Sequence, residues 1–397
     1  MQLTVLLLSL LALVGLVHWY LWLRLVRGTT APGRVRRFGT AAAVLLATLV
    51  PATLVGGRVL PPAVARWLSW PGYLWIGLLF YLLLGLLIIE PVRLAIAVGP
   101  RRTNGDGVAP TATLVATRRV LLARTGAAVV GAAAVGVVGY GVRTALGPPG
   151  ITRLTVPLPR LPPGLDGLRI AVVADIHLGP VLGRRHAERI VRLINEQDAD
   201  LVAIVGDLVD GTVEQLGEAA APLRDLVNTH GSFFVTGNHE YYSGAAPWLR
   251  ELARLGVHPL ANERAEIRAS GNSGVLDLAG VNDLTGANVR DGTSTGPDYD
   301  RALGGRDPGR PVVLLAHQPV QVHEAARRGV DLQLSGHTHG GQMFPFHAVV
   351  RARQPVLHGL HRFGDTRLFV TRGAGFWGPP VRVGAPPEIA IVRLATA

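Results

Sequence analysis

The sequence of 397 residues contains no cysteine and no lysine. The absence of cysteine excludes disulfides and thiolate metal sites, so any metal must be held by His, Asp, Glu or Asn side chains. The absence of lysine means that all 39 basic residues are arginine. Acidic residues are also scarce in the first part of the chain, where Glu90 and Asp106 are the only two before residue 150.

The net charge of +12 is unevenly distributed. Residues 1–149 carry 14 Arg and two acidic residues, whereas residues 150–397 carry 25 Arg and 25 acidic residues. The positive excess thus lies in the apolar part of the chain. Arginines that flank apolar stretches are typical of a membrane protein rather than of a nucleic-acid-binding surface, so no nucleic acid partner is expected. Histidine has the opposite distribution, since only His18 precedes residue 150. A neutral, His-rich region favours a metal site.

Four apolar stretches occur in the first 142 residues, and a transmembrane helix needs about 20 such residues. The stretches are Leu3–Leu23, Ala41–Val55, Tyr73–Ile89 and Gly126–Val142. The second contains Pro51 and is short, and the fourth is rich in Gly and Ala. We expect a multi-pass membrane anchor of about four transmembrane helices over residues 1–146.

Arginine placement predicts the orientation of these helices. The first and third connections hold 11 Arg, whereas the second connection and the segment after the fourth stretch together hold three. The positive-inside rule then places the first and third connections in the cytoplasm and the domain after Val142 on the extracytoplasmic side. The segment Thr117–Leu122 also resembles a twin-arginine export signal, with ordinary flanking charge as the alternative, and both interpretations place the domain outside.

The pattern of an α/β domain begins after a Pro/Gly-rich linker or edge segment at residues 147–167 and covers residues 168–397. Short aliphatic runs of strand length alternate with helical patterns such as His186–Gln197 and Ala219–Asn228. This order predicts a buried, partly parallel sheet, in which ligands bind beyond the carboxyl ends of the strands. The later strand candidates look more antiparallel, and Ala287–Arg310 is predicted to be a long loop.

Five of the predicted strands end at residues that can bind metals. The strands are Leu168–Ala174, Leu201–Val205, Phe233–Thr236, Val312–Ala316 and Leu332–Ser335. The residues that follow them are Asp175 and His177, Asp207, Asn238 and His239, His317, and His337 and His339. Because ligands of such sheets bind at the strand ends, these side chains are expected to converge.

The same residues resemble the five signature blocks of the calcineurin-like metallophosphoesterases, in the order that the family has. The blocks read Asp175-Ile-His177, Gly206-Asp207-Leu-Val-Asp210, Gly237-Asn238-His239-Glu240, His317, and Gly336-His337-Thr338-His339. The resemblance covers residues 168–397. Two further segments resemble a membrane-associated bacterial branch of the family, namely Gly340-Gly341-Gln342 and Gly375–Arg382.

The resemblance implies both a fold and a metal centre. The fold would be a four-layer α/β/β/α sandwich with two mixed sheets, following the α-helical membrane region. One divalent cation would be held by Asp175, His177 and His339, and the other by Asn238, His317 and His337. Asp207 would bridge the two. Imidazole and carboxylate ligands suit Mn, Fe, Zn or Co without distinguishing among them.

The resemblance also implies a reaction, in which His239 is the catalytic acid that protonates the leaving-group oxygen. Two cations about 3.5–4 Å apart clamp a phosphate and lower the pKa of a bridging water, whose hydroxide attacks the phosphorus. Asp210 is interpreted either as a residue that contacts the metal ligands without binding the metal, or as a residue that stabilises the loop. Three aromatic residues have two possible roles, substrate contact or core packing, and the sequence does not decide between them. They are Tyr241, Tyr242 and Trp377.

Together these patterns predict a metal-dependent phosphoesterase at the outer face of a bacterial membrane. The resemblance favours a phosphodiesterase acting on a phosphoester of the envelope, such as a lipid-linked phosphate, with a phosphomonoesterase or a nucleotide-lipid pyrophosphatase as alternatives. A hypothesis of another class makes the membrane region a small transporter or sensor that the soluble domain regulates. The scarcity of intramembrane charge, with Glu90 and His18 as the only candidates, argues against transport. No oligomeric state is predicted.

Overall fold

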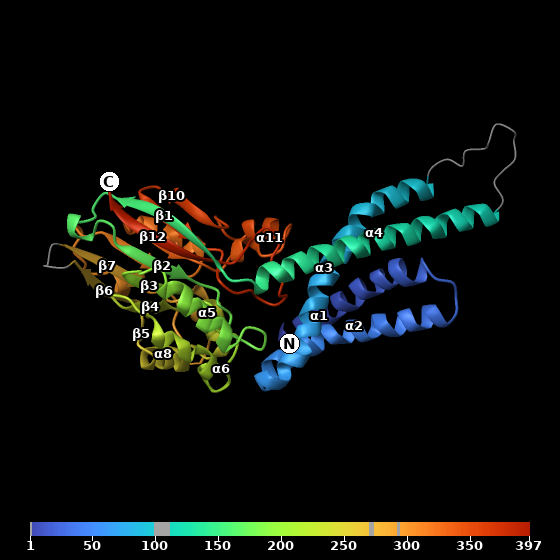
Figure 1. The fold of residues 1–397 in the computed structure, drawn as a ribbon, viewed down its shortest axis with the longest axis horizontal. Helices are drawn as coiled ribbons and strands as arrows, with labels where there is room; N and C mark the ends of the chain where they lie inside the picture. Colours follow the sequence, from blue (N-terminus) through green and yellow to red (C-terminus); the bar gives the residue numbers. More distant parts are fainter. Residues whose placement is uncertain (1, 99–111, 270–273, 292–293) are drawn as a thin grey trace. The chain divides into compact units, whose positions relative to one another are not determined.

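The structure, a computed structural model, describes residues 2–98, 112–269, 274–291 and 294–397 (Figure 1). The chain forms two compact units, Met1–Val142 and Arg143–Ala397. The first unit is helical, and the second contains both β-sheets.

Within its described residues, the first unit carries the apolar stretches on four long helices. They are α1 (Gln2–Leu21), continued by the π-helical segment η1 (Trp22–Arg27), α2 (Arg34–Val59), α3 (Pro62–Val98) and α4 (Ala112–Leu146). Each helix is long and apolar enough to cross a membrane. Many of their large apolar side chains are exposed, as the lipid-facing side chains of a membrane protein are. The helices α2 and α3 extend beyond the predicted stretches because Pro51, Pro71 and Pro91 are accommodated inside them.

The two intramembrane polar candidates are both paired. Glu90 forms ion pairs with Arg24 and, at 3.0 Å, with Arg93. The buried His18 accepts a hydrogen bond at Nε2 from the indole of Trp75, at 3.0 Å. Polar pairs of this kind hold helices together inside a membrane.

The second unit contains, among its described residues, two six-stranded mixed sheets. In spatial order, the first comprises β1 (Gly150–Leu158), β12 (Glu388–Thr396), β2 (Arg169–Val173), β3 (Leu201–Val205), β4 (Ser232–Val235) and β5 (Val257–Pro259). The second comprises β10 (Gly359–Phe363), β11 (Thr366–Val370), β9 (Leu332–Ser335), β8 (Val312–Leu315), β7 (Val275–Gly280) and β6 (Glu263–Arg268). Strand β1 lies within the segment 147–167 and forms an edge of the first sheet, paired in parallel with β12.

The second sheet is more parallel than the sequence predicts. Strands β7, β8, β9 and β11 are mutually parallel, and only β6 and β10 run antiparallel to their neighbours. The helices α9 (Tyr299–Leu303) and α10 (Val322–Arg327) supply the crossovers that parallel strands require. The prediction of a long loop over Ala287–Arg310 is therefore wrong in part, because Ala302 and Leu303 of α9 are buried against the sheet. Residues 292 and 293 of that loop lie outside the described residues.

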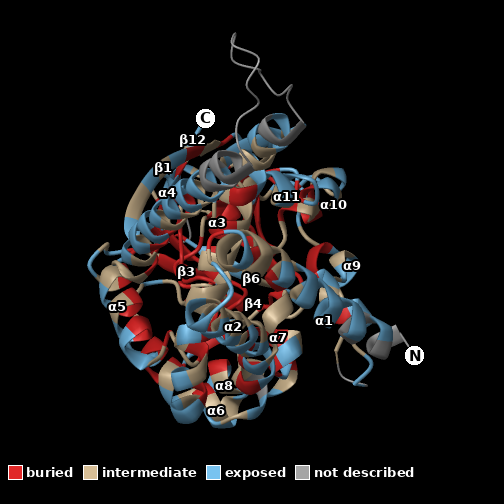
Figure 2. Cartoon of the chain, turned by 90° about the vertical axis from the view of Figure 1, so that its right-hand side faces the viewer, coloured by how far each residue is buried: buried red, intermediate tan, exposed pale blue. Residues whose placement is uncertain are grey.

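Helices cover the outer faces of both sheets, which gives the four-layer α/β/β/α arrangement. The helices α5 (Arg184–Asn195), α6 (Val213–Ala220) and α8 (Ala245–Arg254) pack on the first sheet. The helices α9 and α10 pack on the second sheet. Figure 2 shows α5 with one buried and one exposed side, as its apolar stripe predicts. Between the sheets, an apolar core includes Val205, Phe233, Leu315 and Leu334.

The helix expected over Ala219–Asn228 is displaced in the structure. It begins earlier, because Thr212 and Gln215 form a capping box at the start of α6. It also ends earlier, at Ala220, and a 3₁₀ turn η3 (Ala221–Asp225) containing Pro222 follows. The other short helical segments among the described residues are η2 (Pro163–Leu165), α7 (Asn238–Ser243), η5 (Leu284–Asn288), η6 (Pro319–Gln321), η7 (His339–Gly341) and α11 (His347–Arg351).

Candidate metal centre and acid–base site

The loops that follow β2, β3, β4, β8 and β9 bring the residues of the signature blocks together. Strands β2, β3 and β4 are mutually parallel, as are β8 and β9, so each of these loops leaves a carboxyl end. In chain order the loops carry Asp175 and His177, Asp207, Asn238 and His239, His317, and His337 and His339.

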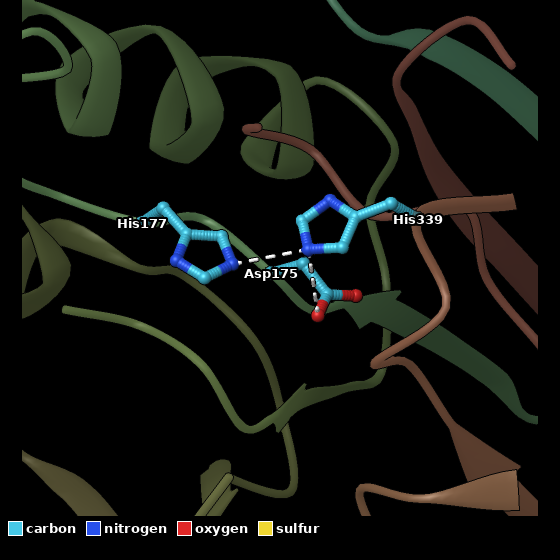
Figure 3. Close-up of side chains that lie close together, drawn as sticks. All are labelled: Asp175, His177 and His339. Carbon is cyan, nitrogen blue, oxygen red and sulfur yellow. Dashed lines mark hydrogen bonds and ion pairs between the residues drawn. The ribbon is translucent and has the colours of Figure 1, made fainter. Parts of the chain in front are cut away.

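Asp175, His177 and His339 form a first group of ligand-type side chains (Figure 3). All three are buried, and one ligand atom of each lies within 4.8 Å of the others. Nε2 of His177 lies 3.1 Å from Nε2 of His339, which in turn lies 3.6 Å from Oδ1 of Asp175. Both imidazoles and the carboxylate therefore present a ligand atom to one point.

Asp207, His317 and His337 form a second group with the same spacing. Nε2 of His317 lies 3.1 Å from Oδ2 of Asp207, although it has no partner in hydrogen-bonding geometry among the described residues. The same Asp207 oxygen lies 3.9 Å from Nε2 of His177 in the first group. The Asp207 carboxylate thus stands between the two groups, where a bridging ligand would stand.

Asn238 provides the test of whether the site suits a metal. Its Oδ1 is buried and has no hydrogen-bond partner in the part of the chain that the structure describes. Leaving such an atom unsatisfied costs about 1–3 kcal/mol, and a cation next to it would offset that cost. A set of carboxylate, amide and imidazole donors fits Mn, Fe, Zn or Co.

Five of these residues adopt the left-handed backbone conformation, which is uncommon outside glycine. Their φ angles are 53° for Asp175, 50° for His177, 52° for Asp207, 70° for His337 and 51° for His339. Each such residue costs on the order of 1–3 kcal/mol, and such strain concentrates at functional sites. The loops therefore hold these side chains in a backbone conformation that costs free energy, which is a feature of functional sites.

Glycines let the loops approach one another closely. A Cβ atom on Gly237 would lie 2.2 Å from Oδ1 of Asp207, and one on Gly336 would lie 2.7 Å from Oδ2 of Asp175. Neither distance is compatible with a side chain. The glycines of the Gly-Asn-His and Gly-His-Thr-His blocks are thus required by the close approach of the Asp207 and Asp175 carboxylates.

The electrostatic environment gives His337, His339 and Asp207 the protonation states in which such groups bind metals. Burial lowers the pKa of His337 to about 4. Burial and the charge of His177 lower the pKa of His339 well below its usual value. Burial would raise the pKa of Asp207, but the charges of His317 and His239 outweigh it and hold that pKa well below its usual range. Burial would lower the pKa of His317, but the charge of Asp207 outweighs it and raises the pKa of that imidazole well above its usual value. Because imidazoles bind metals in the neutral form, His317 would have to release its proton to a binding cation, whereas His337 and His339 are already neutral.

His239 stands beside the two groups and is paired with Asp210. Its Nδ1 lies 2.6 Å from Oδ1 of Asp210, and its backbone N–H donates to Asp207 at 2.9 Å. Burial alone would lower the pKa of His239, but the charge of Asp207 and the hydrogen bond to Asp210 raise it to about 9. An imidazolium with Nδ1 occupied keeps Nε2 for proton donation.

Two residues without a predicted catalytic or ligand role support the loops. Glu240 accepts hydrogen bonds from the backbone N–H groups of Gly237 (2.6 Å), Asp207 (3.0 Å) and Leu208 (2.8 Å), which ties two ligand loops together. Arg382 is fully buried, donates to the carbonyl oxygen of His339 at 3.2 Å and lies 3.2 Å from Nδ1 of that ring. Arg382 stands in the Gly375–Arg382 segment that the sequence singles out, but local pattern does not reveal its burial.

Two mixed sheets with this set of convergent side chains define the calcineurin-like metallophosphoesterases, and the chain belongs to that family. The family model described as calcineurin-like phosphoesterase matches residues 168–341. A protein of Danio rerio described as a transmembrane protein with metallophosphoesterase domain is 34% identical over 388 residues, which are 95% of this chain and 86% of that relative.

A further relative gives the same assignment. A Bos taurus protein with the same description is 40% identical over 289 residues, covering 71% of this chain. That match spans 64% of the bovine relative, just under two thirds of its length. Among solved structures, a 5'-nucleotidase precursor from Thermus thermophilus is similar with a TM-score of 0.37 and 14% identity, over 57% of this chain and 54% of that chain.

Proposed function

We propose that the chain is a metal-dependent phosphoesterase, in its favoured form a phosphodiesterase, that hydrolyses a phosphate ester of the cell envelope. The observation that carries this proposal is the position of Asp207, whose Oδ2 lies 3.1 Å from Nε2 of His317 and 3.9 Å from Nε2 of His177. One carboxylate shared by two ligand groups is the arrangement of a dinuclear centre. The proposed ligands are Asp175, His177 and His339 on one side, and Asn238, His317 and His337 on the other.

The metals and the protein supply different parts of the chemistry. When bound, the divalent cations polarise the phosphoryl oxygens and make a water nucleophilic at neutral pH. The protein orients the proposed metal ligands, because Glu240 and the strained loops fix the positions of these side chains before substrate binds.

His239 is the proposed proton donor. The attacking water releases one proton to solvent, and its oxygen bonds to phosphorus as the bond to the leaving-group oxygen breaks. That leaving oxygen takes the proton from Nε2 of His239, which solvent later replaces. Asp210 keeps the Nδ1–H of the ring engaged at 2.6 Å and so aims Nε2 away from itself. Proton transfer by a positioned side chain contributes typically about 10²–10⁴-fold to the rate.

Residues 1–146 are the proposed membrane anchor, residues 147–167 the connection and residues 168–397 the catalytic domain. The Arg distribution supports an extracytoplasmic catalytic domain. A domain anchored in this way meets substrates that are confined to the envelope, and a lipid-linked phosphodiester is the substrate class that we propose.

The proposal is tested with the full chain in detergent, stripped of metal by a chelator and then reloaded with Mn²⁺. The reloaded protein is expected to hydrolyse bis(4-nitrophenyl) phosphate faster than 4-nitrophenyl phosphate. The stripped protein is expected to hydrolyse neither compound. Full activity after stripping would overturn the metal-dependent mechanism. Faster hydrolysis of the monoester would replace the phosphodiesterase by the phosphomonoesterase alternative.

A matched pair of variants tests the proton donor. His239→Ala is expected to lower kcat by about 10²–10⁴-fold on a diester with an alkyl leaving group. His361→Ala is the control, because His361 is exposed on strand β10 and matches none of the signature blocks. Equal rates for the two variants would remove His239 from the mechanism.

A further inference from the structure

Three aromatic residues near His239 differ in their exposure and in their hydrogen bonds. Tyr241 is engaged by the fold, because its hydroxyl donates to the carbonyl oxygen of Thr295 at 3.1 Å and lies 3.2 Å from the hydroxyl of Thr236. Tyr242 and Trp377 are 64% and 57% exposed. The first aromatic therefore packs, while the other two present their rings to solvent.

Both exposed rings contact His239. The ring centroids of Tyr242 and His239 are 5.5 Å apart with planes at 70°, and those of Trp377 and His239 are 6.2 Å apart with planes at 76°. Both contacts have the edge-to-face geometry that aromatic pairs prefer. The two exposed rings thus flank the side chain that is proposed to protonate the leaving group.

Trp377 is held in place by the backbone rather than by burial. Its N–H donates to Oε1 of Gln342 at 3.0 Å, and Nε2 of Gln342 donates to the carbonyl oxygens of Trp377 (2.9 Å) and Pro379 (3.2 Å). Gln342 adopts a φ of 45° and follows His339 by three residues. Arg382, which contacts the backbone of His339, also donates to the carbonyl oxygen of Gly375 at 2.8 Å.

These contacts suggest a role for two sequence segments that contain no proposed metal ligand. The Gly340-Gly341-Gln342 segment and the Gly375–Arg382 segment bind each other and fix an exposed tryptophan next to the acid. A large aromatic side chain whose backbone is fixed and whose ring is left uncovered has a surface to offer to a ligand.

We propose that Tyr242 and Trp377 form the leaving-group subsite, and that the alcohol released from the substrate carries an aromatic ring or another flat apolar group. The inference rests on the proposed function, because it takes His239 as the donor to the leaving oxygen. The atoms bonded to that oxygen must then lie against the rings that contact His239. Aromatic side chains bind flat apolar groups by stacking. Gln342 is a positioning residue for Trp377.

The test uses one substrate with two competing leaving groups, benzyl methyl phosphate. Hydrolysis releases either benzyl alcohol or methanol, and the ratio of the two reports leaving-group preference independently of the amount of active protein. The wild-type chain loaded with Mn²⁺ is expected to release mainly benzyl alcohol. Trp377→Ala and Tyr242→Ala are each expected to shift the ratio towards methanol by about 3–10-fold, the range for one aromatic contact.

Further variants separate a binding role from a structural one. Trp377→Phe should retain most of the benzyl preference, and Gln342→Ala should shift the ratio in the same direction as Trp377→Ala. Val227→Ala, at an exposed apolar residue between η3 and β4, is the control and should leave the ratio unchanged.

The outcomes distinguish this inference from the function on which it rests. An unchanged ratio in both alanine variants, or preferential release of methanol by the wild type, overturns the leaving-group subsite and leaves the phosphoesterase intact. Hydrolysis of bis(4-nitrophenyl) phosphate without any cleavage of benzyl methyl phosphate does the same. Failure of the metal-loaded chain to cleave any diester refutes the proposed function, and this inference with it.

Discussion

Oδ1 of Asp210 lies 2.6 Å from Nδ1 of His239. The same oxygen lies 3.0 Å from Nδ1 of His177. Burial would raise the pKa of Asp210, but the charge of His177 and the hydrogen bonds from both rings outweigh it and hold that pKa far below its usual value. One ionised oxygen thus orients a proposed metal ligand and the proposed acid together, in the way that carboxylates behind metal-bound histidines do.

Asp210→Asn is expected to lower kcat by about 10–100-fold, the usual cost of losing such a partner. The amide cannot present the same charged acceptor to both rings, so the orientation of His177 and the proton affinity of His239 both change. Steady-state kinetics on a diester and metal analysis of the purified variant check this. Asp225→Asn, at an exposed position in η3, is the matched control. Wild-type kcat in Asp210→Asn would mean that the shared hydrogen bonds do not matter to turnover.

Substitutions in the two ligand groups should remove metals separately. His339→Ala and His337→Ala are each expected to lower the bound Mn²⁺ from about two to about one per chain, because each belongs to one group only. Asp207→Ala, which removes the shared carboxylate, should lower both occupancies. Elemental analysis after gel filtration measures the metal content, with His361→Ala as the control. Two metals retained in both His variants would contradict the division into two groups.

Gly237→Ala should destabilise the catalytic domain, because the added Cβ would lie 2.2 Å from Oδ1 of Asp207 and 2.5 Å from its backbone nitrogen. Overpacking of this kind costs about 1–3 kcal/mol, which corresponds to a Tm lower by about 2–12 °C for a domain of this size. Gly183→Ala is the control, because Gly183 has a negative φ and nothing lies within 4 Å of the added atom. Thermal unfolding followed by tryptophan fluorescence compares the two. A Tm for Gly237→Ala equal to that of Gly183→Ala would show that the loops can separate.

The strand ends that carry the proposed ligands could be predicted from the sequence because each combines two local signals. Leu201–Val205 is a continuous aliphatic run, typical of a strand buried on both faces, and Asp207 follows it after a glycine. The helix α5 likewise follows from the apolar stripe that includes Ile190 and Ile194. Signals of this kind are contained within about ten residues, and the structure has these elements where the pattern expects them.

The remaining features depend on contacts between residues far apart in the chain, which no local pattern contains. Strand β1 pairs with β12 more than 200 residues later, and β11 pairs in parallel with β9. The signature block marks Asp210 as a supporting or structural residue, but only the folded chain brings His177 and His239 to the same oxygen of it. Arg382 likewise stands among glycines and prolines, and only the folded chain buries it behind His339.

The absence of cysteine makes the predicted orientation directly testable. Val227→Cys places a thiol at a position of the catalytic domain that is 69% exposed, and Ala31→Cys places one in the exposed connection between η1 and α2. With the outer barrier of the cell opened and the membrane intact, a membrane-impermeant maleimide should label Val227→Cys at once. It should label Ala31→Cys only after the membrane is dissolved, because the Arg-rich connection is predicted to be cytoplasmic. The reverse pattern would place the catalytic domain inside the cell. Its substrate would then have to be sought on the cytoplasmic face of the membrane, and the envelope substrate proposed above would be excluded.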